Sequence, residues 1–329
     1  MLLATILSRY AFIHSIVNTS YLYINVHNHA PTQSSPSLNV DTRMNISSSL
    51  VRQATSSFLR DDPTLAGGLL RLAFHDAATR EQVESSSDTF TGGSNGSIRY
   101  EVDWGENRGI KRSLQVVENI YENVGKYMGI SFADCIALAG AQSVEYAGGP
   151  TIPIKMGRTD ATKSDSKKRR KILQSSTDRS LVDTTLPSAG LDSDGLRLYF
   201  GALGLSEMEF VALCGAHDLG RHVTLLDMPK SCLKNLTREC LENAPVLMPF
   251  VHKTNPDTFS NIYFQKLLKW YDRKVDSYSF IPTDVDAVVD AGLRRYVKQF
   301  ADDERLFFST FTVAYQKLVD PGATSENRY

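Results

Sequence analysis

The sequence feature that most constrains the fold is the stretch at residues 69–80, LLRLAFHDAATR. Its Leu, Ala and Phe residues favour a helix, and Arg71 and His75 are four residues apart. A helix therefore places both side chains on one face, with Phe74 beside them. That face offers a permanent cation next to a titratable imidazole. Simple packing of the histidine in a helical core is the alternative interpretation of the same pattern.

Composition sets the outer limits. The chain has 329 residues, 42% hydrophobic and 22% charged, which is enough to bury a large core in one or two domains. The net charge of -1 gives no electrostatic case for nucleic acid or an acidic membrane surface. The four cysteines are too few for a disulfide scaffold, although Cys232 and Cys240 are close enough for a local bridge. No apolar run approaches the roughly 18 residues that cross a bilayer.

The first 43 residues differ from the rest of the chain. They are rich in Leu, Ile, Ser, Thr and Asn, and Asp41 is the first acidic residue. This pattern is typical of an organelle transit peptide, with a plastid favoured over a mitochondrion, while the apolar start also suits a secretory signal. We expect one folded domain at 44–320, followed by a tail at 321–329.

The pattern beyond residue 44 predicts a mostly α-helical protein. Ser206 and Glu209 have the spacing of a capping box. The best strand signal is at 151–156, and IPTD at 281–284 is interpreted as a turn. Helices are expected at 47–59, 69–80, 111–128, 131–146, 196–203 and 207–213, from 259 onward, and as a long closing helix at 296–318.

Two polar segments can each be interpreted either as a surface loop or as a functional site. The glycine-rich run at 91–97 suggests phosphate binding, but no hydrophobic strand precedes it, so a tight loop is favoured. The basic run at 167–171 suits a nuclear signal or an anionic docking site, but a solvated loop is favoured.

A second histidine-bearing segment, VALCGAHDLGRHV, occupies residues 211–223. His217 and His222 are five residues apart and would point in different directions on a helix, which argues against a zinc site and a zinc hydrolase. A single histidine supplied to a large cofactor stays open.

Six separated segments then match one family in order, over about residues 47–320. They are RLAFHDA, GGSNGSIR, the Glu101-to-Asn107 spacing, ADCIALAG with GGPTIP and GRTD, VALCGAHDLGR, and FxNxYF followed by IPTD. With these motifs the chain resembles the haem peroxidases of plants, fungi and bacteria. It is most similar to the intracellular class I type and to its ascorbate peroxidase-related group, which has a phenylalanine where Phe74 stands.

The resemblance implies an all-α fold of about ten helices in two lobes with haem b between them. The distal lobe would span about 44–160 and the proximal lobe about 186–295, with the closing helix at 296–318. The implied catalytic residues are Arg71, His75 and Asn107 with Phe74, and the implied haem-binding residues are His217, the axial iron ligand, and its partner Asp284.

These roles agree with the chemistry of peroxide. A neutral imidazole can take a proton from one peroxide oxygen and return it to the other, as proposed for His75. Arg71 would stabilise the negative charge that develops as the O–O bond breaks. An asparagine oxygen orients His75 without adding charge, whereas a carboxylate at Asp284 makes His217 a more basic ligand.

The chain also departs from the family. Leu226 stands where ascorbate peroxidases have an ascorbate-binding arginine, which argues against direct use of ascorbate. The proximal tryptophan position falls near His252. Asp218 and Ser260 carry a carboxylate and a hydroxyl in exchanged positions, so we expect a K⁺ or Ca²⁺ ion held by these two residues.

The sequence therefore predicts a haem peroxidase that reduces hydrogen peroxide and oxidises a small phenolic-type donor, with no nucleic-acid partner and no membrane span. The alternative is a catalytically silent peroxidase-like protein with a binding or structural role in an organelle.

Overall fold

The computed structural model describes residues 40–79, 81–82, 90–91, 93–166, 186, 192–223, 247–249, 254–273 and 280–320. Within these ranges the fold is dominated by eleven α-helices, which confirms the all-α expectation. They are α2 (Val40–Asp61), α3 (Leu65–Ala77), α4 (Lys111–Ile120), α5 (Lys126–Met128), α6 (Phe132–Tyr146), α8 (Ser193–Ala202), α9 (Glu207–Cys214), α12 (Ile262–Arg273), α13 (Pro282–Val289), α14 (Ala291–Asp302) and α15 (Glu304–Leu318).

Short elements complete the described part of the chain. The 3₁₀ turns are η1 (Ser97–Tyr100), η2 (Gly105–Asn107) and η4 (Gly215–Asp218), and a π-helical segment η3 (Tyr121–Gly125) joins α4 to α5. Two antiparallel strand pairs are present: β1 (Glu81–Gln82) with β2 (Phe90–Thr91), and β3 (Arg221–Val223) with β4 (Leu247–Pro249).

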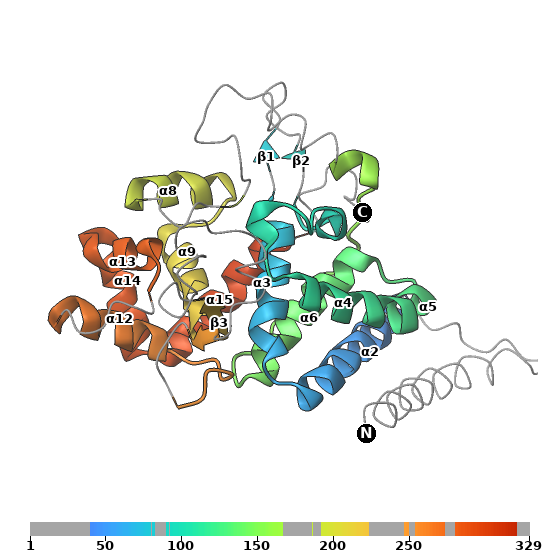
Figure 1. Cartoon of the computed structure of the whole chain (residues 1–329), viewed down its shortest axis with the longest axis horizontal. Coiled ribbons are helices and arrows are strands. Elements are labelled where there is room, and N and C mark those ends of the chain that lie inside the picture. Colours follow the sequence, from blue (N-terminus) through green and yellow to red (C-terminus); the bar gives the residue numbers. More distant parts are fainter. Residues whose placement is uncertain are drawn as a thin grey trace, which may run out of the picture.

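The helices form two groups in space. Figure 1 shows α2, α4, α5 and α6 gathered on one side and α8, α9, α12, α13 and α14 on the other, with α3 between the two groups. Helix α6 is almost entirely buried, and α3 buries its Leu and Ala residues. Phe259, Phe264, Phe307 and Phe311 pack ring against ring in the second group. Helix α3 therefore lies where the two groups meet.

Helix α3 also touches the loop that follows η4. A Cβ atom on Gly67 would lie 2.7 Å from the Cα of Gly220. Only glycine permits this approach, and Gly220 has a φ of 101° that disfavours other residues. The contact brings the helix that carries Arg71 and His75 against the segment that carries His217.

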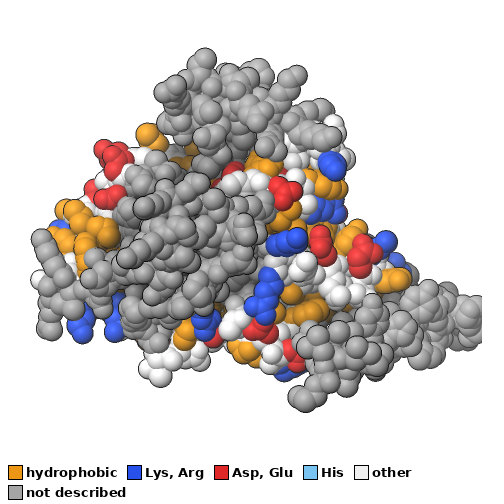
Figure 2. Space-filling model, in the orientation of Figure 1, with side chains coloured by type: hydrophobic (Ala, Val, Ile, Leu, Met, Phe, Trp, Pro, Cys, Tyr) orange, Lys and Arg blue, Asp and Glu red, His pale blue; other side chains and the backbone are white. Residues whose placement is uncertain are grey.

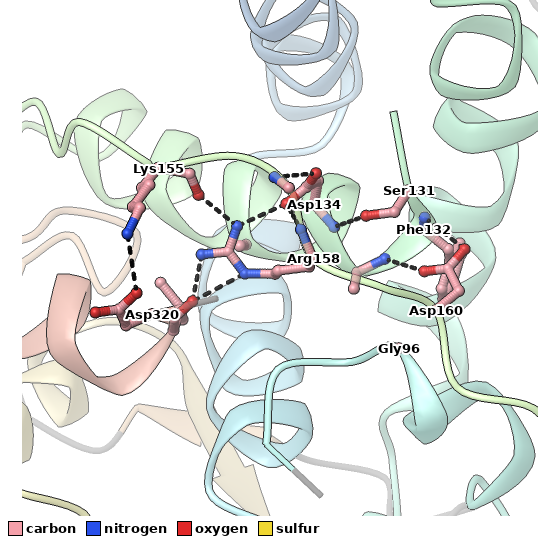
Figure 3. Close-up of polar contacts among 12 residues, drawn as sticks. Gly96, Ser131, Phe132, Asp134, Lys155, Arg158, Asp160 and Asp320 are labelled. Atoms are coloured by element: carbon pink, nitrogen blue, oxygen red, sulfur yellow. Dashed lines mark hydrogen bonds and ion pairs between the residues drawn. The ribbon is translucent and has the colours of Figure 1, made fainter. Parts of the chain in front are cut away.

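A buried ion pair between Arg158 and Asp134 lies where the first group meets the end of α15, as Figure 3 shows. Arg158 Nη1 lies 2.7 Å from Asp134 Oδ1, and their side chains are only 1% and 4% exposed. Arg158 Nε also donates to the carbonyl of Val319 at 2.9 Å. Nearby, Asp160 accepts from the backbone N–H groups of Phe132 and Ala133 and so caps the start of α6. Breaking a buried pair of this kind costs about 3–5 kcal/mol.

The glycine-rich run forms a tight loop bound to α3. The carboxylate of Asp76 accepts from Gly96 N at 2.9 Å and from Ile98 N at 3.3 Å. Gly96 has a φ of 70°, a left-handed conformation suited to glycine. Because these N–H groups already donate to Asp76, they are not available to a phosphate.

Three local expectations were wrong. The closing helix is two helices, because Asp303 leaves the helical conformation and caps α15 by accepting from Leu306 N at 3.0 Å. The IPTD segment is the entry to α13, with Pro282 in the first turn. Residues 151–156 form no strand, and the carbonyl of Ile152 instead accepts from the guanidinium of Arg52.

The other expected helices are confirmed with shifted ends. The capping box of Ser206 and Glu209 is present. Helix α2 begins at Val40, ahead of the domain start expected at 44. Among the described residues no single helix is long and apolar enough to cross a membrane, although the bent pair of α8 with α9–η4 passes by length and composition. On the face drawn in Figure 2, basic and acidic side chains of the described residues are interspersed.

Candidate active site

The distal side of the candidate site is built on α3 and η2. His75 Nδ1 lies 2.8 Å from Asn107 Oδ1, and Asn107 Nδ2 donates to the carbonyl of Glu101 at 2.9 Å. Since the amide nitrogen is used as a donor to a carbonyl, the amide oxygen faces the imidazole and His75 donates from Nδ1. This assignment leaves the lone pair of His75 on Nε2, as a base requires.

Arg71 is fixed by the same short segment that holds His75. Its Nη1 donates to the carbonyl of Arg108 at 2.7 Å and its Nη2 to the carbonyl of Glu106 at 3.1 Å. The rigid guanidinium fork thus uses two separate acceptors on either side of Asn107. Both distal side chains therefore depend on the position of η2. Phe74 is partly buried, with its ring edge-on to His75 at 6.1 Å between centroids.

The distal environment keeps His75 neutral. Burial first, and then the positive charge of Arg71, lower the pKa of His75 to about 3, against a smaller opposing effect of the Asn107 hydrogen bond. Burial and the nearby charge of Arg108 lower the pKa of Arg71 to about 10, so the guanidinium stays charged at neutral pH. The arrangement is a neutral base beside a fixed cation.

The proximal side is built on η4, α12 and α13. His217 Nδ1 lies 2.8 Å from Asp284 Oδ1. The same carboxylate oxygen accepts from the hydroxyl of Tyr263 at 2.8 Å, and Asp284 Oδ2 accepts from Ile281 N at 3.2 Å. Asp284 lies in the first turn of α13, where the helix dipole favours a negative charge. Its side chain is only 1% exposed, so these donors offset the cost of burying the charge.

The pKa of the proximal histidine, His217, is shifted in the opposite direction to that of His75. Burial works against the charged imidazolium, but the charge of Asp284 and its hydrogen bond raise the pKa of His217 overall. Burial, and then the charge of Asp284, raise the pKa of Tyr263 well above its usual value, so its hydroxyl keeps its proton and donates. The sequence used Tyr263 only as part of the FxNxYF motif and missed this contact.

The pair expected to hold a cation is also brought together. Asp218 Oδ2 accepts from Ser260 N at 2.7 Å and from Ser260 Oγ at 2.9 Å, and its Oδ1 accepts from Tyr263 N at 3.1 Å. In this arrangement Asp218 binds backbone N–H groups at the entry to α12. Within the described residues no cluster of three or more His, Cys, Asp or Glu side chains is arranged to hold a metal ion.

The donor set fits a haem group. With Nδ1 directed at Asp284, Nε2 is the nitrogen through which His217 would bind iron. The His217 side chain is 30% exposed although Asp284 is 1% exposed, so the imidazole is sealed at the carboxylate and accessible elsewhere. A neutral base and a cation on helix α3, which contacts the loop after η4 at Gly220, complete a set suited to haem iron and peroxide.

Comparison with known proteins identifies the family of the chain. The model of the peroxidase family matches residues 51–303. The chain is 35% identical to putative L-ascorbate peroxidase 6 of Arabidopsis thaliana over 78% of this chain and 64% of that protein. It is 32% identical to a mitochondrial cytochrome c peroxidase of Cryptococcus neoformans over 80% of this chain and 63% of that protein. A putative heme-binding peroxidase of Mycosarcoma maydis is 31% identical over 80% of this chain and 74% of that protein.

The helical fold and the family match together define a haem peroxidase scaffold. The chain belongs to the peroxidase family, and its relatives include ascorbate and cytochrome c peroxidases, which confirms the class I resemblance. The chain spans slightly less than two thirds of the length of the Arabidopsis and Cryptococcus relatives.

The structure places Arg71, His75 and Asn107 around η2, and it places His217 beside Asp284. The catalytic and haem-binding roles of these five residues stay predictions. Other predictions lie outside the described residues: Leu226, His252, the basic run at 167–171, and the Cys232 and Cys240 pair.

Proposed function

We propose that this protein is a haem b peroxidase that reduces hydrogen peroxide to water and oxidises a small organic donor. One observation carries the proposal. Two histidines, one on α3 and one in η4, each have Nδ1 2.8 Å from an acceptor, which is a neutral amide for His75 and a carboxylate for His217. The amide suits a proton-transferring base, and the carboxylate suits an axial ligand.

His217 would hold the haem iron through Nε2, with Asp284 fixing the ring and increasing its basicity. When bound, haem b supplies the redox centre that accepts the oxidising equivalents of peroxide. His75, held in one tautomer by Asn107, would take a proton from one oxygen of hydrogen peroxide and return it to the other oxygen, which leaves as water. Arg71 stabilises the charge on that leaving oxygen.

The donor is proposed to be small and phenolic in type. Some relatives are named for ascorbate and others for cytochrome c, so the family alone does not select between them. Leu226, in place of the arginine that holds ascorbate, supports a donor other than ascorbate. A K⁺ or Ca²⁺ ion at Asp218 and Ser260 stays a prediction, tested by metal analysis of the purified protein, where absence of both ions refutes it.

An organelle is proposed as the location. Relatives are named as peroxisomal in Oryza sativa and as mitochondrial in Cryptococcus, and the first 43 residues have a transit-like composition. A plastid over a mitochondrion stays a prediction from the sequence, and imaging of the tagged full-length chain tests it.

The proposal is tested by the absorption spectrum of haem-reconstituted protein before and after hydrogen peroxide. We expect a Soret band with one histidine ligand that shifts on peroxide addition and returns when guaiacol is added. Turnover with guaiacol, ascorbate and reduced cytochrome c, measured side by side, then ranks the donors. A chain that takes up no haem supports the alternative of a catalytically silent peroxidase-like protein.

A further inference from the structure

The proximal carboxylate has a second side-chain donor that the matched motifs do not assign. Tyr263 Oη lies 2.8 Å from Asp284 Oδ1, the same oxygen that His217 Nδ1 contacts at 2.8 Å. Tyr263 is completely buried, and its ring lies edge-on to the His217 ring at 6.1 Å between centroids. The hydroxyl is therefore held in place by packing.

We propose that Tyr263 is a positioning residue that limits how strongly Asp284 draws the proton of His217. The inference rests on the proposed function, because it assumes that His217 is the axial ligand.

Hydrogen bonding explains the effect. One carboxylate oxygen shared by two donors has less electron density for each of them, so it accepts more weakly from either one. A weaker acceptor leaves His217 with more neutral-imidazole character. A more neutral ligand gives less electron density to the iron and favours the ferric state less. Tyr263 therefore makes the reduction potential of the haem less negative than Asp284 alone would set it.

The position of Tyr263 suits this role. It lies on α12, one residue after Ile262, where the helix begins, and its backbone N–H donates to Asp218 Oδ1 at 3.1 Å. Asp218 directly follows His217 in the chain. The residue thus bonds both to the residue next to the ligand and to the partner of the ligand. Movement of α12 would change the His217–Asp284 contact.

Tyr263→Phe removes only the hydroxyl and keeps the ring. The matched control is Tyr315→Phe, since Tyr315 is equally buried and its hydroxyl donates to the carbonyl of Ala137 at 2.9 Å, in α6. Both variants lose one buried hydrogen bond, but only one of them touches the proximal carboxylate. Thermal unfolding of both variants records the structural cost.

The test measures the ferric/ferrous midpoint potential of haem-reconstituted full-length protein by spectroelectrochemistry, together with the iron–histidine stretching frequency by resonance Raman. We expect Tyr263→Phe to shift the potential negative and to raise the stretching frequency, with Tyr315→Phe close to wild type. In an Asp284→Asn background the Tyr263→Phe shift should shrink, because a neutral amide oxygen is the weaker acceptor.

Three results overturn the inference. They are a Tyr263→Phe potential equal to that of the Tyr315→Phe control, an undiminished shift in the Asp284→Asn background, or loss of haem from Tyr263→Phe alone, which would make the tyrosine structural. Failure of the wild-type chain to take up haem is a different result, and it overturns the proposed function along with this inference.

Discussion

The distal and proximal histidines have the same local geometry and opposite electrostatics. Each has Nδ1 2.8 Å from a side-chain oxygen. The partner of His75 is the neutral amide of Asn107, and the pKa of His75 is lowered to about 3. The partner of His217 is the carboxylate of Asp284, and the pKa of His217 is raised. At equal distances the two imidazoles therefore differ because burial and the Arg71 charge lower the pKa of His75, whereas the Asp284 charge outweighs burial at His217.

The supports of the two histidines differ in the same way. On the distal side, Arg71 adds a positive charge, and the atoms that accept from Arg71 and from Asn107 are neutral backbone carbonyls. On the proximal side, a helix N-terminus and the hydroxyl of Tyr263 stabilise a buried anion. The distal side disfavours protonation of His75, and the proximal side favours positive charge on His217.

Removing the distal base should have the largest effect. His75→Gln keeps a polar side chain but cannot accept and return a proton, so we expect the rate constant for the reaction with peroxide to fall by roughly 10²- to 10⁴-fold. Stopped-flow absorption at the Soret band measures it. Haem uptake should stay normal because His217, and not His75, is the proposed ligand. A loss below tenfold would show that another group transfers the proton.

Neutralising the distal cation should come next. Arg71→Gln removes the charge that is proposed to stabilise the leaving oxygen, so we expect the same rate constant to fall by roughly 10²- to 10³-fold. The pKa of His75 should also rise, since the Arg71 charge is one cause of its lowering. The control is Arg60→Gln, an exposed arginine at the end of α2. Equal rates for the two variants would contradict the assigned role of Arg71.

Replacing the carboxylate partner of His217 by an amide, the kind of partner that His75 has, should have a smaller effect than the two distal changes. Asp284→Asn leaves His217 with an amide acceptor like that of His75, so we expect haem affinity to fall roughly 10- to 100-fold, as for other losses of a ligand's hydrogen-bond partner. Titration with haem followed at the Soret band measures it. Asp286→Asn, on the same helix α13 and only partly buried, is the control. Unchanged affinity in Asp284→Asn would mean that the carboxylate does not support the ligand.

Local sequence pattern was enough to predict part of the candidate site. The spacing of Arg71 and His75 on a good helix-forming stretch was enough to place both on one face, because helix geometry is local. Asn107, His217 and Asp284 were assigned only through the family motifs. Their meeting depends on how η2, α12 and α13 pack, and no local periodicity encodes such packing.

Other failures have local causes. The aromatic pattern continues from α14 into α15, and the break at Asp303 has no Gly or Pro to mark it, although an aspartate capping Leu306 N is a recognisable signal. The β-branched residues near Ile152 looked like a strand, but that segment is held by the side chain of Arg52 instead of a neighbouring strand. The contact of Tyr263 with Asp284 joins two helices, so the sequence gives no sign of it.

The reverse replacement, Asn107→Asp, gives His75 a carboxylate partner. It should change the peroxide rate constant least at neutral pH and most clearly in acid. A carboxylate beside His75 favours the imidazolium, so the pKa of His75 should rise from about 3, by roughly 1–3 units. The base works only when neutral, and activity is lost as the pH falls through its pKa. The acid limb of the peroxide rate profile should therefore move to higher pH, with less than about a tenfold change at pH 7.

Gly105→Asp is the matched control for this charge, because Gly105 lies in the same η2 turn and a Cβ there meets nothing within 4 Å. It adds the same negative charge two residues away without contacting His75, so its acid limb should stay close to that of wild type. An identical shift in both variants would mean that the general charge of the loop, and not the direct partner of the imidazole, sets the pKa of His75. The contrast between the two histidines would then not depend on amide against carboxylate.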